Sequence, residues 1–367
     1  MNAARKGAVP ARGAPAGLVR DLVLTGVFGL ALFLAPTLLR DWFGQASVSY
    51  LSLGLRALAV AVLALTWDMV ARTGQLSLAH GAFYGAGAYT AAILLKNTGS
   101  PLWLGIPLAA AVGAVLALGL GAVTLRLFGI YFAIATLAFT EVLKAVVQEA
   151  LPQAVAGGAA GINVPALFRP TFVPGEMERW EIAFLRNQSY FYVYAGILLL
   201  AIVVSVLIQR SRLRSAFTAI RTNEWVASVV GVNPARYKLL AFVLSSALVG
   251  MLGAVEAHRL GSAVPEGAFA VHVTVLALVT PIFGGLYTTV GPILAAGVLA
   301  TIEETFKRSL SDGYMIAYGL VLVLAILFMP RGLMGLFRGL TRRMKRGPGP
   351  PSEASASPAA GGEETGA

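Results

Sequence analysis

The chain has 367 residues, of which 57% are hydrophobic and 12% are charged, about half the charged content of a soluble globular domain. One soluble core cannot hide that much apolar surface, so we expect lipid to be the solvent for much of the chain. The absence of cysteine excludes disulfides, thiol catalysis and Cys-ligated metals. The three histidines, His80, His258 and His272, are too far apart along the chain to suggest a metal centre.

The net charge of +11 does not indicate a nucleic-acid partner. The basic residues lie between apolar runs and at the two ends of the chain, which is typical of a membrane protein, and no nucleic-acid recognition motif is readable. The first polar segment, 1–20, is a basic tail. The apolar run 22–39 that follows is longer than the roughly 7–15 apolar residues of a cleaved signal peptide, so we interpret it as a retained first span.

Further apolar runs, each close to the ~20 residues that cross a bilayer, predict the remaining membrane spans. A single helix over 267–302 would be about 54 Å long, so Pro281 and the Gly284-Gly285 pair should break it into two spans. We therefore predict an all-α, polytopic protein of about ten spans within a transmembrane domain at 21–335. The expected spans after the first are 50–69, 73–95, 101–125, 128–148, 190–208, 239–255, two within 267–302, and 313–329.

An even number of spans places both ends of the chain on one side. Most of the 28 lysines and arginines fall in the tails and in the connections on that side, which predicts cytoplasmic termini. The connection 151–189 then lies outside and the loop 209–238 lies in the cytoplasm. The tail 336–367 lacks aromatic residues and is expected to be disordered.

Sequence motifs for catalysis are missing from the chain. No G-x-x-x-x-G-K-[ST] phosphate loop, G-x-S-x-G elbow or H-E-x-x-H pair occurs, so we expect no enzyme and no cofactor in this chain.

Within the loop 209–238, residues 215–230 have helical character and are followed by Gly231 and Asn233-Pro234, which are helix-stop signals. This amphipathic helix either docks a soluble partner or lies on anionic lipid, and the pattern alone leaves both open.

Polar and small residues in the spans are the other candidates for function. Small residues on the 73–95 span allow close helix packing in lipid, and neighbouring polar groups could line a pathway or bond the bundle together. Glu141 and Lys144 share one helix face and are functional ionisable groups, a pair that compensates itself, or a pair close to the membrane interface. The candidates for a translocation path or for helix packing are Gln75, Ser77, His80, Gly81, Tyr84, Gly85, Glu141 and Lys144.

Four blocks of sequence carry a resemblance to a known family. They read TGQLSLAHGAFYGAGAYTAAILL at 73–95, LFGIYFAIATLAFTEVLKAVV at 127–147, AGGAAGINVP at 156–165 and AIRTNEWVASVVGVNPARYKLLAFVLSSALVGMLGAVEAH at 219–258. In this order they resemble the branched-chain amino acid permease family of ABC importers, the LivM-type subunit. The third block departs from the family pattern at its first Ala, where Thr is usual.

The resemblance implies a type II-like importer fold, transport of Leu, Ile or Val, and location in the bacterial inner membrane. It also implies a homologous second permease, a periplasmic binding protein and two ABC ATPase subunits that bind ATP and Mg²⁺. In that family the loop matching 215–233 is the coupling helix that docks on the ATPase. The resemblance places this role here on Arg221, Asn223, Glu224, Ala227 and Gly231.

Other functions remain open at this stage. A permease of the same type could carry an aromatic amino acid, an amide or urea. A secondary transporter would use Glu141, Lys144 or His80 in a proton relay, and a scaffold or channel would show no substrate saturation.

Overall fold

The protein is seen here in a computed structural model. It describes residues 15–100, 102–127, 129–165, 168, 178–310, 313–328 and 332–335. The predicted tail 336–367 and residues 1–14 lie outside the described part. Residues 15–20, which we predicted to belong to the N-terminal tail, instead form the start of the first helix.

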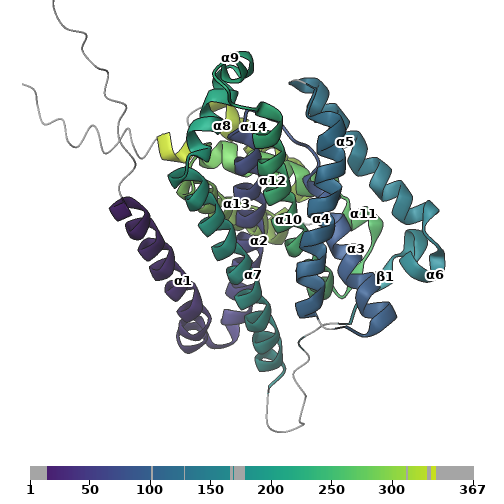
Figure 1. The fold of residues 1–367 in the computed structure, drawn as a ribbon. Helices are drawn as coiled ribbons and strands as arrows, with labels where there is room; N and C mark the ends of the chain where they lie inside the picture. The colour runs from purple at the N-terminus through teal and green to yellow at the C-terminus, as the bar shows by residue number, and fades with distance from the viewer. Residues whose placement is uncertain are drawn as a thin grey trace, which may run out of the picture.

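The described residues are almost all helical, as the apolar composition predicts (Figure 1). The first half of the fold consists of α1 (Pro15–Phe43), η1 (Gly44–Ala46), α2 (Ser47–Ala71), α3 (His80–Thr98), α4 (Leu102–Thr124), α5 (Ile130–Ala145), η2 (Val146–Ala150), α6 (Gln153–Ala156), η3 (Gly158–Ala160) and β1 (Ile162–Asn163). Here η1 and η3 are short 3-10 helices and η2 is a π-helical turn. The second half consists of α7 (Arg179–Arg210), α8 (Leu213–Thr222), α9 (Glu224–Val229), α10 (Pro234–Leu260), β2 (Ser262–Ala263), α11 (Pro265–Ala268), α12 (Val271–Gly284), α13 (Val290–Leu310) and α14 (Tyr314–Phe328).

Several predicted boundaries are wrong, and two of them change how the segments between spans are understood. The span expected at 73–95 begins only at His80, and 75–79 has no regular secondary structure. The span expected at 190–208 begins at Arg179, so the second part of the connection 151–189 is helix. A capping box explains the early start, because Glu178 and Glu181 satisfy each other's backbone N–H groups.

The predicted break in 267–302 is confirmed. α12 ends at Gly284, and the turn 285–289 leads into α13. Gly285 has a φ of +111°, a conformation that favours glycine. A Cβ at Gly284 would collide with the backbone of Gly291, so glycine also permits the two helices to start close together.

The helix α2 lies at the centre of the bundle. It packs against α7, α10, α12 and α13, and every residue from Val60 to Ala71 is buried. A helix that is apolar all round is expected in such a position. Trp67, the largest of its buried side chains, donates from Nε1 to the Ser77 carbonyl at 2.9 Å and so fixes the non-helical segment 75–79 before α3.

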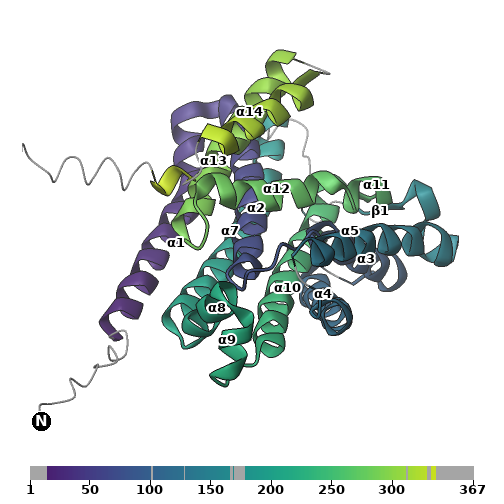
Figure 2. The same ribbon diagram turned by 90° about the horizontal axis from the view of Figure 1, so that it is seen from above.

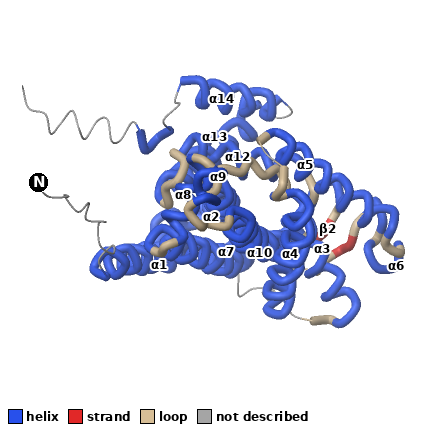
Figure 3. Tube along the Cα trace, turned by 45° about the horizontal axis from the view of Figure 1, so that its top comes forward, coloured by secondary structure: helices blue, strands red, loops and turns tan. Residues whose placement is uncertain are grey.

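The remaining helices lie on two sides of this centre. Seen from above, α3, α4, α5 and α11 gather on one side of α10, and α1 lies on the opposite side next to α7 (Figure 2). α14 runs along the outside of α13 (Figure 3). A two-stranded antiparallel pairing, Ile162 with Ala263 and Asn163 with Ser262, joins the connection after α5 to the end of α10.

Within the described residues, six helical stretches are long and apolar enough to cross a membrane, and one of them joins α1 and α2. This supports a multi-pass membrane protein. The total of ten spans stays a prediction.

Candidate functional site

The loop 209–238 contains two short helices where we predicted one. The chain turns at Asn223, whose backbone is extended, with φ −160° and ψ 110°. Its Oδ1 accepts a hydrogen bond from the Val226 N–H at 3.1 Å, which is the usual role of an asparagine at a helix N-cap. The prediction of one helix at 215–230 is therefore wrong, because Asn223 ends α8 and starts α9. Gly231, with a φ of +87°, ends α9 as predicted.

The two helices bury one face and expose another. Phe217 and Ile220 of α8 and Ala227 of α9 are buried against the bundle, and the Phe217 ring meets the edge of the Tyr237 ring. The outer face of α9 and the residue after it present four large apolar side chains, which we call the α9 patch: Trp225, Val226, Val229 and Val230, exposed by 75%, 48%, 68% and 70%. Apolar clusters of this kind mark interaction surfaces more often than scattered single residues do.

Two charged residues of this segment attach it to the bundle. Glu224 Oε2 accepts from Lys238 Nζ of α10 at 2.5 Å, and the Lys238 side chain is only 5% exposed. Arg221 lies over the ring of Tyr287, with 3.8 Å from Cζ to the ring centroid. A Cβ at Gly74, in the turn after α2, would lie 3.2 Å from the Arg221 Cα. The end of α8 therefore touches both the α2–α3 turn and the α12–α13 turn.

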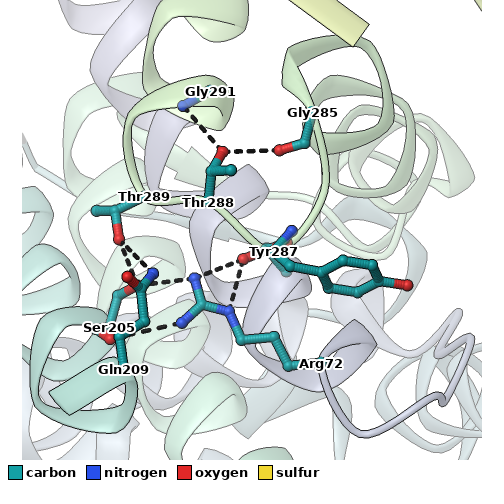
Figure 4. Close-up of polar contacts among 9 residues, drawn as sticks. Arg72, Ser205, Gln209, Gly285, Tyr287, Thr288, Thr289 and Gly291 are labelled. Atoms are coloured by element: carbon teal, nitrogen blue, oxygen red, sulfur yellow. Dashed lines mark hydrogen bonds and ion pairs between the residues drawn. The ribbon is translucent and has the colours of Figure 1, made fainter. Parts of the chain in front are cut away.

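Tyr287 also belongs to a buried polar cluster, which we call the Asp68 network. It consists of Asp68, Arg72, Ser205, Gln209, Tyr287 and Thr289, and Figure 4 labels all of these except Asp68. Asp68 is 0% exposed, and its Oδ2 accepts from Arg72 Nε at 2.8 Å. Its Oδ1 accepts from the Tyr287 N–H at 2.6 Å. Because a buried charge is costly unless it is paired and hydrogen-bonded, these contacts hold the α12–α13 turn against the end of α2.

The arginine of the pair extends the network to α7. Arg72 Nη2 donates to Ser205 Oγ at 3.0 Å, and Ser205 Oγ lies 3.0 Å from Thr289 Oγ1. In the amide orientation that satisfies both of its atoms, the Gln209 oxygen accepts from Arg72 Nη2 at 3.0 Å and from Thr289 Oγ1 at 2.8 Å. The network thus joins α2, α7 and the α12–α13 turn through side chains.

Tyr287 connects the outer and inner parts of this site. Its φ of +65° makes it the one non-glycine residue with a positive φ among the described residues, which is a strained conformation for a bulky side chain. Its ring lies under Arg221 and its N–H binds Asp68. Tyr287 therefore contacts both α8, through Arg221, and α2, through Asp68.

The predicted polar residues of the 73–95 segment lie close to the same end. Gln75 is 5% exposed, and its amide atoms have no partner within the described part of the chain. It lines a small cavity of about 220 Å³ together with Arg221 and Lys238. Ser77 is fully buried, and its Oγ accepts from the Ala79 N–H at 3.3 Å. His80 Nε2 lies 3.3 Å from Ser245 Oγ of α10.

The small residues of α3 make close helix contacts. The Gly81 N–H donates to Thr274 Oγ1 of α12 at 2.9 Å. A Cβ at Gly85 would lie 2.5 Å from the Phe269 ring, and a Cβ at Gly253 would collide with the Tyr84 carbonyl. These contacts explain a role of Gly81, Tyr84 and Gly85 in helix packing.

Glu141 and Lys144 do not form an ion pair with each other. Lys144 Nζ instead binds Glu266 Oε2 of α11 at 2.9 Å, where the Glu266 side chain is 70% exposed. The interpretation of Glu141 and Lys144 as a self-compensating ion pair is therefore wrong, because the direct partner of Lys144 is Glu266. The other charges of the apolar runs are paired as well, Arg56 with Glu303 and Glu256 with Arg259.

Sequence reasoning missed most of the Asp68 network. Asp68 and Arg72 are four residues apart on one helix, a spacing that identifies a pair on one helix face. Tyr287, Ser205 and Gln209 carry no such signal, because only the fold brings them to Arg72. No group of three or more His, Asp or Glu side chains suited to a metal occurs among the described residues.

Comparison with known proteins adds a second kind of observation. The family described as "Branched-chain amino acid transport system / permease component" matches residues 49–329. LivM of Salmonella typhimurium, a high-affinity branched-chain amino acid transport system permease protein, is 33% identical over 285 residues, which are 74% of this chain and 66% of that protein. LivM of Escherichia coli is 32% identical over the same shares. BraD of Pseudomonas aeruginosa is 26% identical over 75% of this chain and 91% of its own length. The chain thus covers just under two thirds of the LivM proteins. No solved structure matches it significantly.

Proposed function

The chain belongs to the family of branched-chain amino acid transport system permease components, and on this premise we propose that it is the transmembrane permease subunit of an ATP-driven importer for Leu, Ile and Val. Its relatives are named as permease proteins of high-affinity branched-chain amino acid transport systems. In this proposal the chain provides the passage through the membrane and the partner subunits hydrolyse ATP, so the chain itself is not an enzyme and binds no cofactor.

The observation that carries the proposal is the construction of the α8–α9 segment. It presents an exposed apolar patch, as a docking surface must. It is also connected through Arg221 and Tyr287 to the buried Asp68 network. A segment that only lay on lipid would not need this connection to the bundle.

The proposed partners are two ABC ATPase subunits, a second homologous permease and a periplasmic binding protein. The binding protein delivers the amino acid to the mouth at the far end of the bundle. Closure of the ATPases pushes the α8–α9 segment, and the displacement reaches α2 and the α12–α13 turn through Tyr287. The bundle then changes between outward-open and inward-open states.

The proposed location is the bacterial inner membrane, with both termini in the cytoplasm. Arg20, near the start of the described chain, and Met334, near its end, line one cavity together with Arg214 of α8. This arrangement supports two termini on the side of the α8–α9 segment.

Substitution of the α9 patch tests the docking. Trp225→Ser with Val229→Ser removes the apolar surface but leaves the buried face of α8 and α9 intact. Purified complexes should lose the ATPase subunits, since buried apolar area drives most of such associations. Trp103→Ser, which removes a tryptophan that is 61% exposed at the other end of the bundle, should retain them. Full retention of the ATPase subunits in the double variant would contradict the assignment of the α9 patch as the docking surface.

Uptake measured beside ATP hydrolysis tests the transmission. Glu224→Gln weakens the bond to Lys238, and Gly231→Ala places a side chain at a φ of +87°. Both variants should hydrolyse ATP in reconstituted liposomes but accumulate less leucine per ATP. If both transport normally, these two residues have no part in coupling.

The alternative of a proton-coupled transporter has less support. Lys144 is committed to an exposed partner, and His80 is buried beside Ser245. The chain alone in liposomes with an imposed pH gradient should take up no leucine. Uptake under those conditions would overturn the ATP-driven proposal.

The identity of the transported solute needs a separate measurement. Competition by aromatic amino acids, amides or urea against labelled leucine in the complete transporter identifies the solute.

A further inference from the structure

A cavity of about 880 Å³ opens between α1, α7, α8 and the start of α13. Its charged part lies where these helices begin or end, and consists of Arg20, Asp21, Arg72, Arg210, Arg214 and Arg221. Its apolar part lies one to two helical turns further along them and consists of Leu24, Phe28, Ile202, Val206, Ile293 and Leu294. The cavity therefore changes from charged to apolar along the helix axes, as a bilayer does from its surface to its interior.

The charged part carries an excess of positive charge. Asp21 is its one acidic residue and is bound by Arg210, with 2.8 Å from Nε to Oδ2. The Arg214 side chain has no hydrogen-bond or ion-pair partner in the part of the chain that the structure describes. Arg20 lies 3.7 Å from Asp21, and its side chain is 75% exposed. Arg20 and Arg214 thus offer exposed guanidinium groups to an anion.

The apolar part faces a space that water would fill poorly. Leu24 of α1 is 58% exposed and Leu294 of α13 is 45% exposed. α1 itself lies at the edge of the bundle, next to α7 (Figure 1, Figure 3). The cavity is consequently lined on one side by an edge helix, at the depth where the acyl chains of the bilayer lie.

We propose that this cavity binds one anionic phospholipid, with its phosphate at Arg20 and Arg214 and an acyl chain along Leu24, Phe28 and Leu294. Basic pockets between membrane helices suit anionic headgroups, and guanidinium groups bind phosphate oxygens through charge-assisted hydrogen bonds. Free phosphate would use the arginines but leave the apolar wall uncovered. The proposal requires only that α1 and α7 lie in a bilayer, so it does not depend on the transported solute.

Native mass spectrometry of the full-length chain, purified with the subunits that accompany it, tests this site. The probes are phosphatidylglycerol and phosphatidylcholine with identical acyl chains. The wild type should retain phosphatidylglycerol in preference to phosphatidylcholine. Arg20→Gln with Arg214→Gln should weaken phosphatidylglycerol binding on the order of 30-fold, because each interfacial arginine contributes about fivefold in affinity. Both arginines are exposed, so the fold should survive.

Arg236→Gln is the matched control, since Arg236 is an exposed arginine beside the same loop and does not line the cavity. It should bind phosphatidylglycerol as the wild type does. Equal retention of the two lipids, or unchanged binding in the double variant, would overturn the site. Displacement of phosphatidylglycerol by equimolar inorganic phosphate or glycerol phosphate would show that the ligand is the free anion. Retention of neither lipid would show that the cavity does not hold a phospholipid. Both results contradict the proposal.

Discussion

Two regions of the bundle are held together in opposite ways. In the first, which we call the glycine-packed unit, α3, α4 and α10 approach backbone to backbone. A Cβ at Gly87 would collide with Gly250, and a Cβ at Gly113 would lie 2.6 Å from the Ser246 carbonyl. In the second, the charged end, α2, α7 and the α12–α13 turn meet through the side chains of the Asp68 network.

The two regions differ in how easily their helices can move relative to one another. Backbone contacts without side chains leave no rotamer to change, so the glycine-packed unit should behave as a rigid body. Hydrogen bonds between side chains can exchange partners at small cost if new partners are offered. The α8–α9 segment contacts the charged end, which is where a moving part needs to be attached. Each of the following predictions tests one side of this comparison.

The largest effect is expected from Asp68→Asn. The substitution keeps the shape of the side chain but leaves the Arg72 guanidinium buried without its counter-charge, which costs about 3–5 kcal/mol. The midpoint of thermal unfolding in detergent should fall sharply. Glu304→Gln is the control, because it breaks a pair of the same i,i+4 spacing with Arg308, whose side chain is 61% exposed, and should change stability by about 0–1 kcal/mol. Equal effects of the two substitutions would show that the network is not a buried structural element.

A smaller effect is expected from Gly113→Ala in the glycine-packed unit. Its Cβ would collide with the backbone of α10, so α4 must shift at a cost of roughly 1–3 kcal/mol. Gly119→Ala lies on the same helix and meets nothing within 4 Å, so it should be neutral or slightly stabilising through helix propensity. Thermal unfolding of the two variants, measured side by side, checks the difference. A neutral Gly113→Ala would mean that α4 and α10 do not pack this closely.

The sequence predicted these two regions unequally. The spans of the glycine-packed unit are readable because apolar length and small residues are local properties of the sequence. The tight pairing of Gly113 with Ser246, and of Gly87 with Gly250, is not readable, since it depends on which helices meet.

At the charged end, the sequence indicated the loop 209–238 and the stop at Gly231. The break at Asn223 was missed because its capping role competes with a strong apolar helical pattern around it. Tyr287 could not be found, because its importance comes from a positive φ and two contacts made by distant segments. The functional roles of the predicted coupling and pathway residues stay predictions.

A moderate effect on function is expected from Tyr287→Ala. The substitution removes the ring under Arg221, a contact that contributes about 1 kcal/mol when partly exposed, and it lowers the strain of the positive φ only slightly. Leucine uptake per ATP should fall by up to about fivefold, while thermal stability changes little. Tyr287→Phe keeps the ring and should behave as the wild type. If Tyr287→Ala couples normally, α8 does not act through the α12–α13 turn.

The smallest effect is expected from Lys144→Gln. Lys144 lies outside both regions and binds Glu266, whose side chain is 70% exposed, and such pairs contribute about 0–1 kcal/mol. Stability and leucine uptake should both stay close to wild type, and uptake should respond to external pH as it does in the wild type. The matched variant Glu266→Gln removes the other partner and should be equally mild. Loss of uptake in Lys144→Gln but not in Glu266→Gln would show that the lysine acts on the solute or on a proton. The functional part of the bundle would then extend beyond the charged end to α5.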